Sequence, residues 1–349
     1  MFFASDNTGP AHPKVLDAIV SANAGYAPSY GRDPLTEDAA DMVRDVFEAP
    51  DASIHFVATG TAANSLILAS LATPFDAIHC TACAHITEDE CNAPEFFSGG
   101  AKLRHVQDEH GLMDPAALAS ALGSHDPRSI MVPQKGPVSL TQVTETGTLY
   151  TLDHLRTLTD IAHSHGVKVH LDGARFANAI AALGCSPAEM TWKAGIDAVS
   201  FGGTKNGCLG VEACVIFDPS LSREMELHRK RAGHLFSKHR FLAAQMKGYL
   251  SDGLWRDLAQ RANAAGQRLA AILRAHPEAR LLHEPQANMI FVSLPRRIHK
   301  VLIAAGANYD LHGSLKTGSD EDHITARFVC DWSATEAAIN EFATLLSSR

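Results

Sequence analysis

The sequence lacks a long apolar run, an excess of basic charge and an even set of cysteines. No stretch of its 349 residues approaches the length of a membrane span, and Met1–Asp6 turns polar at once instead of forming a leader. The formal net charge of −9 disfavours binding to nucleic acid. No internal repeat or low-complexity segment interrupts the chain. We therefore expect a cytoplasmic protein that binds neither membranes nor nucleic acids.

The seven cysteines are scattered over the chain, which argues for reduced thiols and against a disulfide framework. His79, Cys80, Cys83, His85 and Cys91 lie close enough together to suggest zinc. Cys80 and Cys83 have no matching distal pair, however, and buried free cysteines are common, so we expect no metal site. A metal-binding or scaffold protein built on this cluster is the alternative to an enzyme.

The pattern of apolar residues predicts an α/β fold. Short β-rich runs alternate with longer helical patterns, which is typical of a mainly parallel sheet, here of seven-stranded type, between helices. The runs expected to form its strands are Ile54–Ala58, Ala77–Thr81, Ser129–Pro133, Val167–Leu171, Ala198–Phe201 and Ala213–Phe217. Helices are expected to start at Asp33-Pro34 and to cover Leu152–His163.

A change of pattern near residue 250 predicts a second domain. One long helical stretch runs from Phe217 to about Tyr249, and Ser251–Gly253 forms a hinge into the helix Leu254–Leu273. The small α+β part that follows has strands Met289–Leu294 and Ile324–Val329, with helices near Arg297–Ala305 and Ala334–Leu346. We expect a large domain at residues 1–250, in which segment 1–34 contributes to the site, and a small domain at residues 251–349.

The first candidate site is the turn of small residues Thr59–Asn64, which joins the strand Ile54–Ala58 to the apolar helix Ser65–Leu71. Such a helix start presents free backbone amides and the positive end of the helix dipole. This arrangement is suited to binding a phosphate group, although an ordinary strand-to-helix turn has the same pattern.

Two more motifs follow apolar strands. Val169–Arg175 ends in the carboxylate of Asp172, where ligands bind in open α/β sheets, although Asp172 could equally cap the next helix. In Val199–Gly207 the glycines allow a close backbone approach to a ligand and precede Lys205. A lysine among apolar walls is pushed toward its neutral, nucleophilic amine, whereas most lysines are solvated.

Together the three motifs match the needs of pyridoxal 5'-phosphate (PLP). A carboxylate keeps the pyridine nitrogen protonated, a lysine amine condenses with the aldehyde, and helix-end amides hold the phosphate. The sequence therefore predicts a PLP enzyme with its cofactor on Lys205.

The chain resembles the threonine aldolase family, of the aspartate-aminotransferase-like (fold type I) group of PLP enzymes. The resemblance spans nearly the whole chain and is clearest around Lys205 and Asp172. The motifs that carry it are Ser5-Asp6-Asn7-Thr8 with Pro10, Tyr30–Pro34, Gly60–Asn64, His85 with Glu88, Asp172–Arg175, Gly202–Gly207 and Arg327–Val329.

The resemblance implies roles for these residues in cofactor binding and catalysis. Lys205 would form the Schiff base with PLP, and Asp172 would pair with the pyridine nitrogen. His85 would stack on the ring and is the leading candidate for the catalytic base, although a core histidine is the alternative. Further cofactor contacts are implied for Gly60, Thr61, Thr204 and Arg175.

The resemblance also implies substrate contacts and shared sites. Ser5, Arg175 and Arg327 would bind the substrate carboxylate, which a planar guanidinium fits well. Arg231 and Lys238 would reach the cofactor phosphate from a neighbouring subunit of a homodimer or homotetramer, and Tyr30 would line the site across that interface. A solvated helix face is the alternative for the basic run His228–Arg231, as a surface cation is for Arg327.

The implied activity is retro-aldol cleavage of L-threonine, L-allo-threonine and related β-hydroxy-α-amino acids, such as phenylserine, to glycine and an aldehyde. A β-eliminating lyase or an aminotransferase of the same fold is the alternative. One motif departs from the family pattern, because Leu140–Glu145 replaces a Glu-Asn-Thr-His segment that carries a second histidine. The identity of the base and the preference between threo and erythro substrates stay open.

Overall fold

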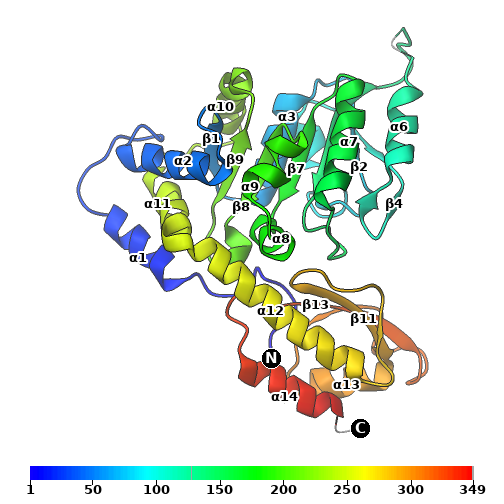
Figure 1. The fold of residues 1–349 in the computed structure, drawn as a ribbon. Coiled ribbons are helices and arrows are strands. Elements are labelled where there is room, and N and C mark those ends of the chain that lie inside the picture. Colours follow the sequence, from blue (N-terminus) through cyan, green and yellow to red (C-terminus); the bar gives the residue numbers. More distant parts are fainter. Residues whose placement is uncertain (127, 348–349) are drawn as a thin grey trace.

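The computed structural model describes residues 1–126 and 128–347 and shows two sheets of different size (Figure 1). The large one has seven strands in the order β1-β9-β8-β7-β6-β2-β3. Its strands are β1 (Ser53–Val57), β2 (Asp76–Cys80), β3 (Lys102–His105), β6 (Gln134–Thr141), β7 (Val169–Gly173), β8 (Ala198–Gly202) and β9 (Glu212–Ile216). The five strands from β8 to β3 run parallel, whereas β9 is antiparallel to both β8 and β1. The predicted α/β class with a mainly parallel sheet is confirmed.

Helices cover both faces of this sheet. Successive residues of a strand point to opposite faces, so a strand that is apolar at every position needs helices packed on both sides. On β9, Val215 packs in the largest apolar core while its neighbour Ile216 packs in a separate core with α3. The helices of this unit are α2 (Pro34–Phe47), α3 (Gly60–Leu71), α4 (His85–Glu88), α5 (Ala93–Phe97), α6 (Pro115–Gly123), α7 (Leu152–Ser164), α8 (Phe176–Leu183), α9 (Pro187–Met190), α10 (Ser222–Arg231) and α11 (Arg240–Leu250). A short hairpin, β4 (Asp108–Glu109) and β5 (Leu112–Met113), lies beside them.

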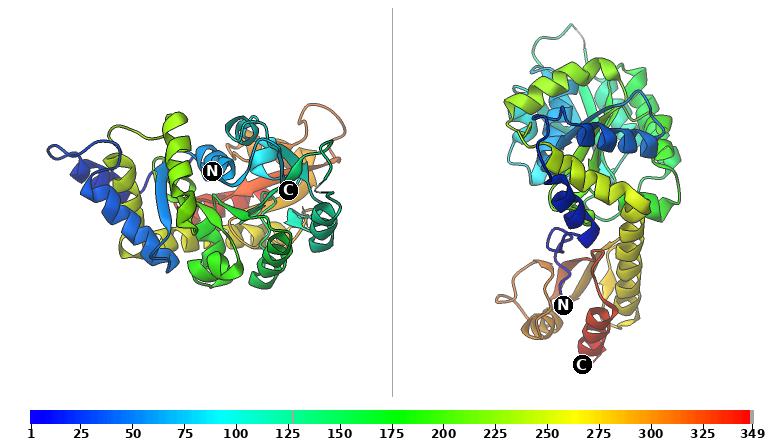
Figure 2. Two further views of the ribbon diagram at one scale, coloured as in Figure 1. Left: turned by 90° about the horizontal axis from the view of Figure 1, so that it is seen from above. Right: turned by 90° about the vertical axis from the view of Figure 1, so that its left-hand side faces the viewer.

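The smaller sheet has four strands in the order β10-β11-β13-β12 and its own apolar core. Its elements are β10 (Arg280–Leu281), β11 (Met289–Pro295), α13 (Arg296–Ala304), β12 (Asp310–His312), β13 (His323–Val329) and α14 (Glu336–Ser347). The helix α12 (Leu254–Ala275) runs from the larger unit along the smaller one (Figures 1 and 2). Asp252 and Gly253, both with positive φ, form the bend before it, at the predicted hinge. The division into domains at residue 250 stays a prediction.

The first residues of the chain connect the two units. The Phe3 amide donates to the Asn308 carbonyl, its carbonyl accepts from the Val329 amide, and its ring packs edge-on against Phe342. The chain then passes the loop that follows β8, where the His12 amide donates to the Gly207 carbonyl, and enters α1 (Pro13–Ala22), which packs on α11. The N-terminal segment is thereby held in contact with both units, and its Asn7 lines the cavity at the carboxyl ends of the large sheet's strands.

The predicted strand Ser129–Pro133 is wrong, because β6 begins only at Gln134. Ile130 and Met131, the apolar residues that suggested a strand, are 94% and 86% exposed. Gly136 and Pro137, which disfavour a strand in the sequence, lie inside β6. A side chain at Gly136 would meet the Ala77 carbonyl at 2.6 Å, so glycine allows the irregular pairing of β6 with β2.

The helix expected from Phe217 to Tyr249 is broken. The helix α10 ends at Arg231, Gly233 adopts a φ of +77° that favours glycine, and α11 begins at Arg240. The strand predicted at Val167–Leu171 lies two residues further on, at Val169–Gly173. No helix among the described residues is long and apolar enough to cross a membrane.

Candidate active site

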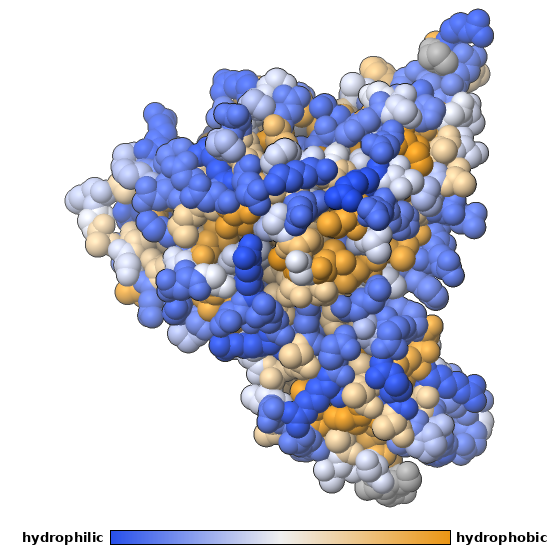
Figure 3. Space-filling model, viewed as in Figure 1, coloured by the Kyte–Doolittle hydropathy of each residue, from blue (hydrophilic) through white to orange (hydrophobic). Residues whose placement is uncertain are grey.

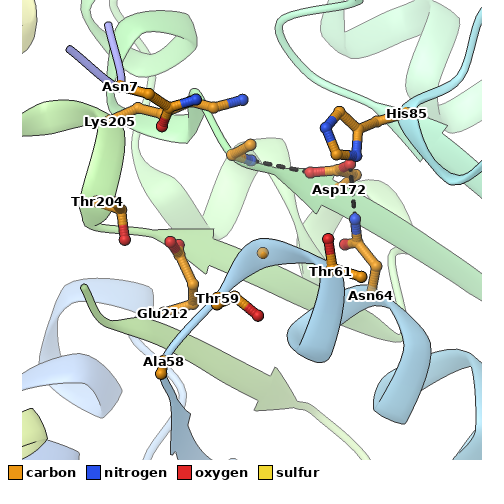
Figure 4. A pocket seen from close by; sticks show the side chains of 12 residues that line it. Asn7, Ala58, Thr59, Thr61, Asn64, His85, Asp172, Thr204, Lys205 and Glu212 are labelled. Atoms are coloured by element: carbon orange, nitrogen blue, oxygen red, sulfur yellow. Dashed lines mark hydrogen bonds between the residues drawn. The ribbon is translucent and has the colours of Figure 1, made fainter. Parts of the chain in front are cut away.

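A cavity of about 240 Å³ lies at the carboxyl ends of the parallel strands (Figure 4). Loops and helix starts that follow β1, β2, β7 and β8 meet there, as expected for an open α/β sheet. The lining residues are Asn7, Ala58, Thr59, Gly60, Thr61, Asn64, His85, Asp172, Ala174, Thr204, Lys205 and Glu212. The structure thus brings together six residues predicted from the sequence: Gly60, Thr61, His85, Asp172, Thr204 and Lys205.

Asp172 is held rigidly near the end of β7. Its side chain is buried, one oxygen accepts from the Asn64 amide group at 2.9 Å, and the other accepts from the Ala174 backbone at 3.0 Å. The alternative role of Asp172 as a helix cap is not seen, because α8 begins after Arg175 without a side-chain cap.

A buried chain of hydrogen bonds fixes the Asn64 side chain in turn. The Ser200 hydroxyl donates to the Asn64 oxygen at 2.7 Å, and His170 bridges Ser200 and Ser139 at 3.0 Å on each side. Burial lowers the pKa of His170 to about 4, so its ring is neutral and can donate on one side and accept on the other. This network fixes the amide that holds Asp172.

The turn Thr59–Asn64, called the phosphate cradle below because of its predicted role, forms the start of α3. Thr59 caps the helix, since its side chain accepts from the Ala62 amide and its carbonyl from the Ala63 amide. The amides of Gly60 and Thr61 have no acceptor within the helix and are available to a ligand. A Cβ atom at Gly60 would meet no atom within 4 Å, which leaves open space beside these amides.

Lys205 sits in a short 3-10 turn, Thr204–Asn206, directly after β8. The Asn206 side chain anchors this turn by donating to the Tyr249 hydroxyl and the Trp255 carbonyl, both at 2.8 Å. Gly202 lets the chain pass close by, because a Cβ atom there would lie 2.6 Å from the Ala174 carbonyl. The turn therefore presents Lys205 to the cavity from a fixed backbone (Figure 4).

His85 is paired with a buried acid that the sequence analysis missed. Its Nδ1 lies 2.9 Å from Oε1 of Glu90, an oxygen that also accepts from the Asn64 side chain at 2.8 Å. Glu88, the acid of the quoted motif, is exposed. The hydrogen bond with Glu90 raises the pKa of His85 against the opposite effect of burial, and burial raises the pKa of Glu90. His85 and Asp172 are thereby joined through Glu90 and Asn64.

The residues expected to bind the substrate carboxylate lie outside this cavity. Arg175 donates to both oxygens of Asp6, at 2.7 and 2.9 Å, and both side chains are buried. Arg327 donates to Asp310 and to the Ala4 carbonyl, and its Nε is buried without a partner among the described residues. The Ser5 hydroxyl accepts from the Asn7 backbone, which turns Asn7 toward the cavity.

Tyr30, Arg231 and Lys238 also lie away from the cavity of their own chain. The Tyr30 amide donates to the Ser237 carbonyl, and Lys230 lies 4.6 Å from the centre of the Tyr30 ring. Arg231 and Lys238 are exposed at the two ends of the loop between α10 and α11. The structure therefore groups these three residues near one surface loop.

The cysteine and histidine cluster does not converge on one point. The Cys80 thiol contacts the Thr87 hydroxyl, the Cys83 thiol contacts Thr81, and Cys91 is exposed. Within the described part of the chain, no group of three or more His, Cys, Asp and Glu side chains could hold a metal ion.

The segment that replaces the family's second histidine is anchored away from the cavity. The Gln142 side chain donates to the Tyr150 carbonyl at 3.0 Å and accepts from the Tyr150 amide at 3.0 Å. Glu145 is half-buried, and its charge acts on His85 and Arg175. His85 is the one histidine among the residues that line the cavity.

Comparison with known proteins gives a consistent assignment. The model of the beta-eliminating lyase family matches residues 3–295. Low-specificity L-threonine aldolases of a Pseudomonas species and of Pseudomonas aeruginosa are each 40% identical over 342 residues, covering 98% of this chain and 95% of theirs. The structure of a Leishmania major threonine aldolase has a TM-score of 0.91 at 27% identity and covers 99% of this chain and 98% of its own. The chain therefore belongs to the beta-eliminating lyase family and, within it, to the low-specificity L-threonine aldolases.

Proposed function

We propose that this protein cleaves L-threonine, L-allo-threonine and related β-hydroxy-α-amino acids, such as phenylserine, to glycine and an aldehyde. It is a PLP-dependent lyase of the threonine aldolase type. The observation that carries the proposal is the convergence of Lys205, Asp172 and the start of α3 on one cavity, in a chain 40% identical to low-specificity L-threonine aldolases. A β-eliminating lyase or aminotransferase would use the same sheet, but the nearly full-length relatives favour the aldolase.

The residues around the cavity fit PLP. The free amides of Gly60 and Thr61 suit the phosphate, the open space beside Gly60 leaves room for it, and Thr204 adds a hydroxyl. Asp172 is buried and positioned by two hydrogen bonds, as a partner for the pyridine nitrogen must be. In our proposal Lys205 holds the cofactor covalently through its Nζ. When bound, PLP supplies an electron sink for the pair released when the Cα–Cβ bond breaks.

His85 is our candidate for the catalytic base. Glu90 engages Nδ1, so Nε2 is the nitrogen that can face a substrate. A carboxylate on Nδ1 stabilises the charged ring that results when Nε2, or a water bound to it, takes the proton of the β-hydroxyl group. Glu90 therefore positions and polarises His85 without reaching the substrate.

In our proposal Arg175, Arg327 and Ser5 orient the substrate through its carboxylate. Two nitrogens of Arg175 are already bound by Asp6, which fixes the direction of its remaining one. Arg327 lies on β13 of the small unit, and its Nε has no hydrogen-bond partner within the part of the chain that the structure describes. An anionic substrate would thus draw the small unit and the N-terminal segment together over the cavity.

We further propose that a homodimer or homotetramer completes the site, with Tyr30, Arg231 and Lys238 contacting the cofactor pocket of a neighbouring subunit. Apolar side chains are exposed close to this surface, including Leu16 and Val20 on α1, which are 42% and 73% exposed. Figure 2 shows α1 on the outside of the large unit, and Figure 3 shows further apolar patches on an otherwise polar face. We also place the enzyme in the cytoplasm.

A product assay with several substrates tests the proposed activity. L-threonine, L-allo-threonine and phenylserine should each yield glycine and the matching aldehyde in equal amounts. Release of ammonia with a keto acid would instead identify an eliminating lyase, and amino transfer to a keto acid would identify an aminotransferase.

A further inference from the structure

Glu212 is an acidic residue in an otherwise apolar strand, and the proposed reaction gives it no role. It is the first residue of β9, between Val211 and Ala213, which are both fully buried. Its own exposure is 5%, yet it lines the cavity together with Lys205 and Gly60. A carboxyl group in such a place is costly unless it is paired or neutral.

The strand register places Glu212 between two functional loops. Its Cα is paired with Val57 on β1, which leads into the phosphate cradle, and with Gly202 on β8, which leads into the Lys205 turn. Figure 4 shows Glu212 near Thr59 and Thr204, while Asp172 and His85 lie together on another side of the cavity. Glu212 thus stands at the phosphate end of the proposed site.

The contacts of Glu212 do not include a full counter-charge. One oxygen accepts from the Gly203 amide at 3.1 Å, and the Thr204 side chain is hydrogen-bonded to the carboxyl group. Within the described residues, no Lys, Arg or His side chain is hydrogen-bonded to it, and Lys205 acts on it only at longer range. Burial raises the pKa of Glu212 to about 7, so the group is largely neutral in mildly acid solution and charged in alkali.

We propose that the Glu212 carboxyl group contacts the cofactor phosphate as a hydrogen-bond donor and makes retention of PLP depend on pH. The inference rests on the proposed function, because it takes the cradle at Gly60 and Thr61 as the phosphate site. A protonated carboxyl donates to a phosphate oxygen, whereas a carboxylate at the same place repels it. Retention should therefore weaken as the pH rises through the pKa of Glu212.

Other titratable groups also face this end of the cavity. The charges of Lys205 and Asp172 act on Glu212 at longer range, the pKa of the buried Cys208 thiol is raised by the Glu212 charge, and Tyr249 lies behind the Lys205 turn. His85 loses its positive charge with rising pH and would weaken anion binding in the same direction. All of these groups are unchanged in Glu212→Gln, so the difference between that variant and the wild type isolates Glu212.

The first test measures cofactor loss from the holoenzyme. Wild-type and Glu212→Gln proteins are dialysed at pH values on both sides of 7, and the released PLP is measured by absorbance. The wild type should lose its cofactor about tenfold faster on the alkaline side, since a group that titrates on binding changes affinity by up to about tenfold per pH unit. Glu212→Gln, which keeps an acceptor for Gly203 but cannot ionise, should lose most of this dependence.

A second readout uses inorganic sulfate, whose charge is constant over this range. Its affinity for the full-length protein purified without PLP should fall with pH in the wild type and much less in Glu212→Gln. Thr204→Val removes a hydroxyl that lowers the pKa of Glu212, so in this variant the fall in sulfate affinity should begin at higher pH than in the wild type. If Glu212→Gln does not fold, calorimetry of sulfate binding to the wild type above pH 7 in buffers of different ionisation enthalpy should show proton uptake.

Equal pH dependence in the wild type and Glu212→Gln, or the absence of proton uptake, would overturn the inference and leave the proposed function intact. A wild-type protein that binds neither PLP nor sulfate at any pH would overturn both proposals.

Discussion

Glu90→Gln tests the proposed role of His85 by removing a charge with little change in shape. In the wild type, Oε1 of Glu90 is bound by His85 at 2.9 Å and by Asn64 at 2.8 Å. Glutamine keeps one acceptor oxygen there but carries no charge. Hydrogen bonds to charged groups contribute about 1.5–3 kcal/mol and neutral ones about 0.5–1.5 kcal/mol, a difference of about 1 kcal/mol or slightly more.

This difference applies chiefly to the state in which His85 has gained a proton, so kcat/KM should fall roughly tenfold. Because the hydrogen bond with Glu90 raises the pKa of His85, the variant should have a lower pKa for this group. A base with a lower pKa stays neutral in more acid solution, so the acid limb of kcat/KM should move to lower pH. An assay of acetaldehyde release from L-threonine across pH measures both effects.

Glu88→Gln is the matched control, because Glu88 lies two residues away and is exposed. It should leave both the rate and the pH profile unchanged. An unshifted acid limb in Glu90→Gln, with a rate close to that of the wild type, would refute the pairing of Glu90 with a catalytic His85.

Three further predictions concern stability and the phosphate cradle. Asp6→Ala should destabilise the protein by about 3–5 kcal/mol, because it leaves the buried Arg175 guanidinium unpaired; a small fall in the thermal midpoint would contradict this. Burial raises the pKa of Asp6, but the opposite effect of Arg175 is larger, so the pKa of Asp6 in the folded protein is lowered. The pair therefore stabilises the fold fully above the unfolded-state pKa of about 3.9, and this stabilisation is lost as the pH falls through the lower pKa of the folded state. Wild-type stability should thus fall more steeply in acid than that of Asp6→Asn. Gly60→Ala should fold normally, since its methyl group meets open space, but should bind PLP about tenfold more weakly in a fluorescence titration because that space is the proposed phosphate position; unchanged affinity would place the phosphate elsewhere.

Much of the fold could be predicted because the strands that matter are apolar and bounded by turn residues. The sequence predicts the end of β8 to within one residue and the end of β7 to within two, and in a parallel sheet two such ends lie at one edge, which brings Asp172 and Lys205 together. The failures are local. Gly136 lies in β6 because the Ala77 backbone leaves no space for a side chain there. This contact between distant segments cannot be predicted from the residues next to Gly136.

The supporting residues of the site depend on contacts between distant segments. Glu90 follows a short helix and becomes a partner of His85 and Asn64 only after α3 and α4 pack. Glu212 did leave a signal, since an acid within the apolar run Val211–Ile216 is as unusual as Arg327 between Ala326 and Phe328. The reasoning that makes Arg327 a candidate site residue applies equally to Glu212. Only the pairing of Glu212 with Val57 in the sheet, however, shows that Glu212 lies beside the phosphate cradle.

The most direct test of the central claim is the visible absorption spectrum of the purified protein, taken before and after borohydride reduction, beside that of Lys205→Ala. If Lys205 holds PLP at this cavity, the wild type shows an imine band that disappears on reduction, and the variant lacks the band. A colourless wild-type protein after addition of PLP, or a variant with the same reducible band, would contradict the account.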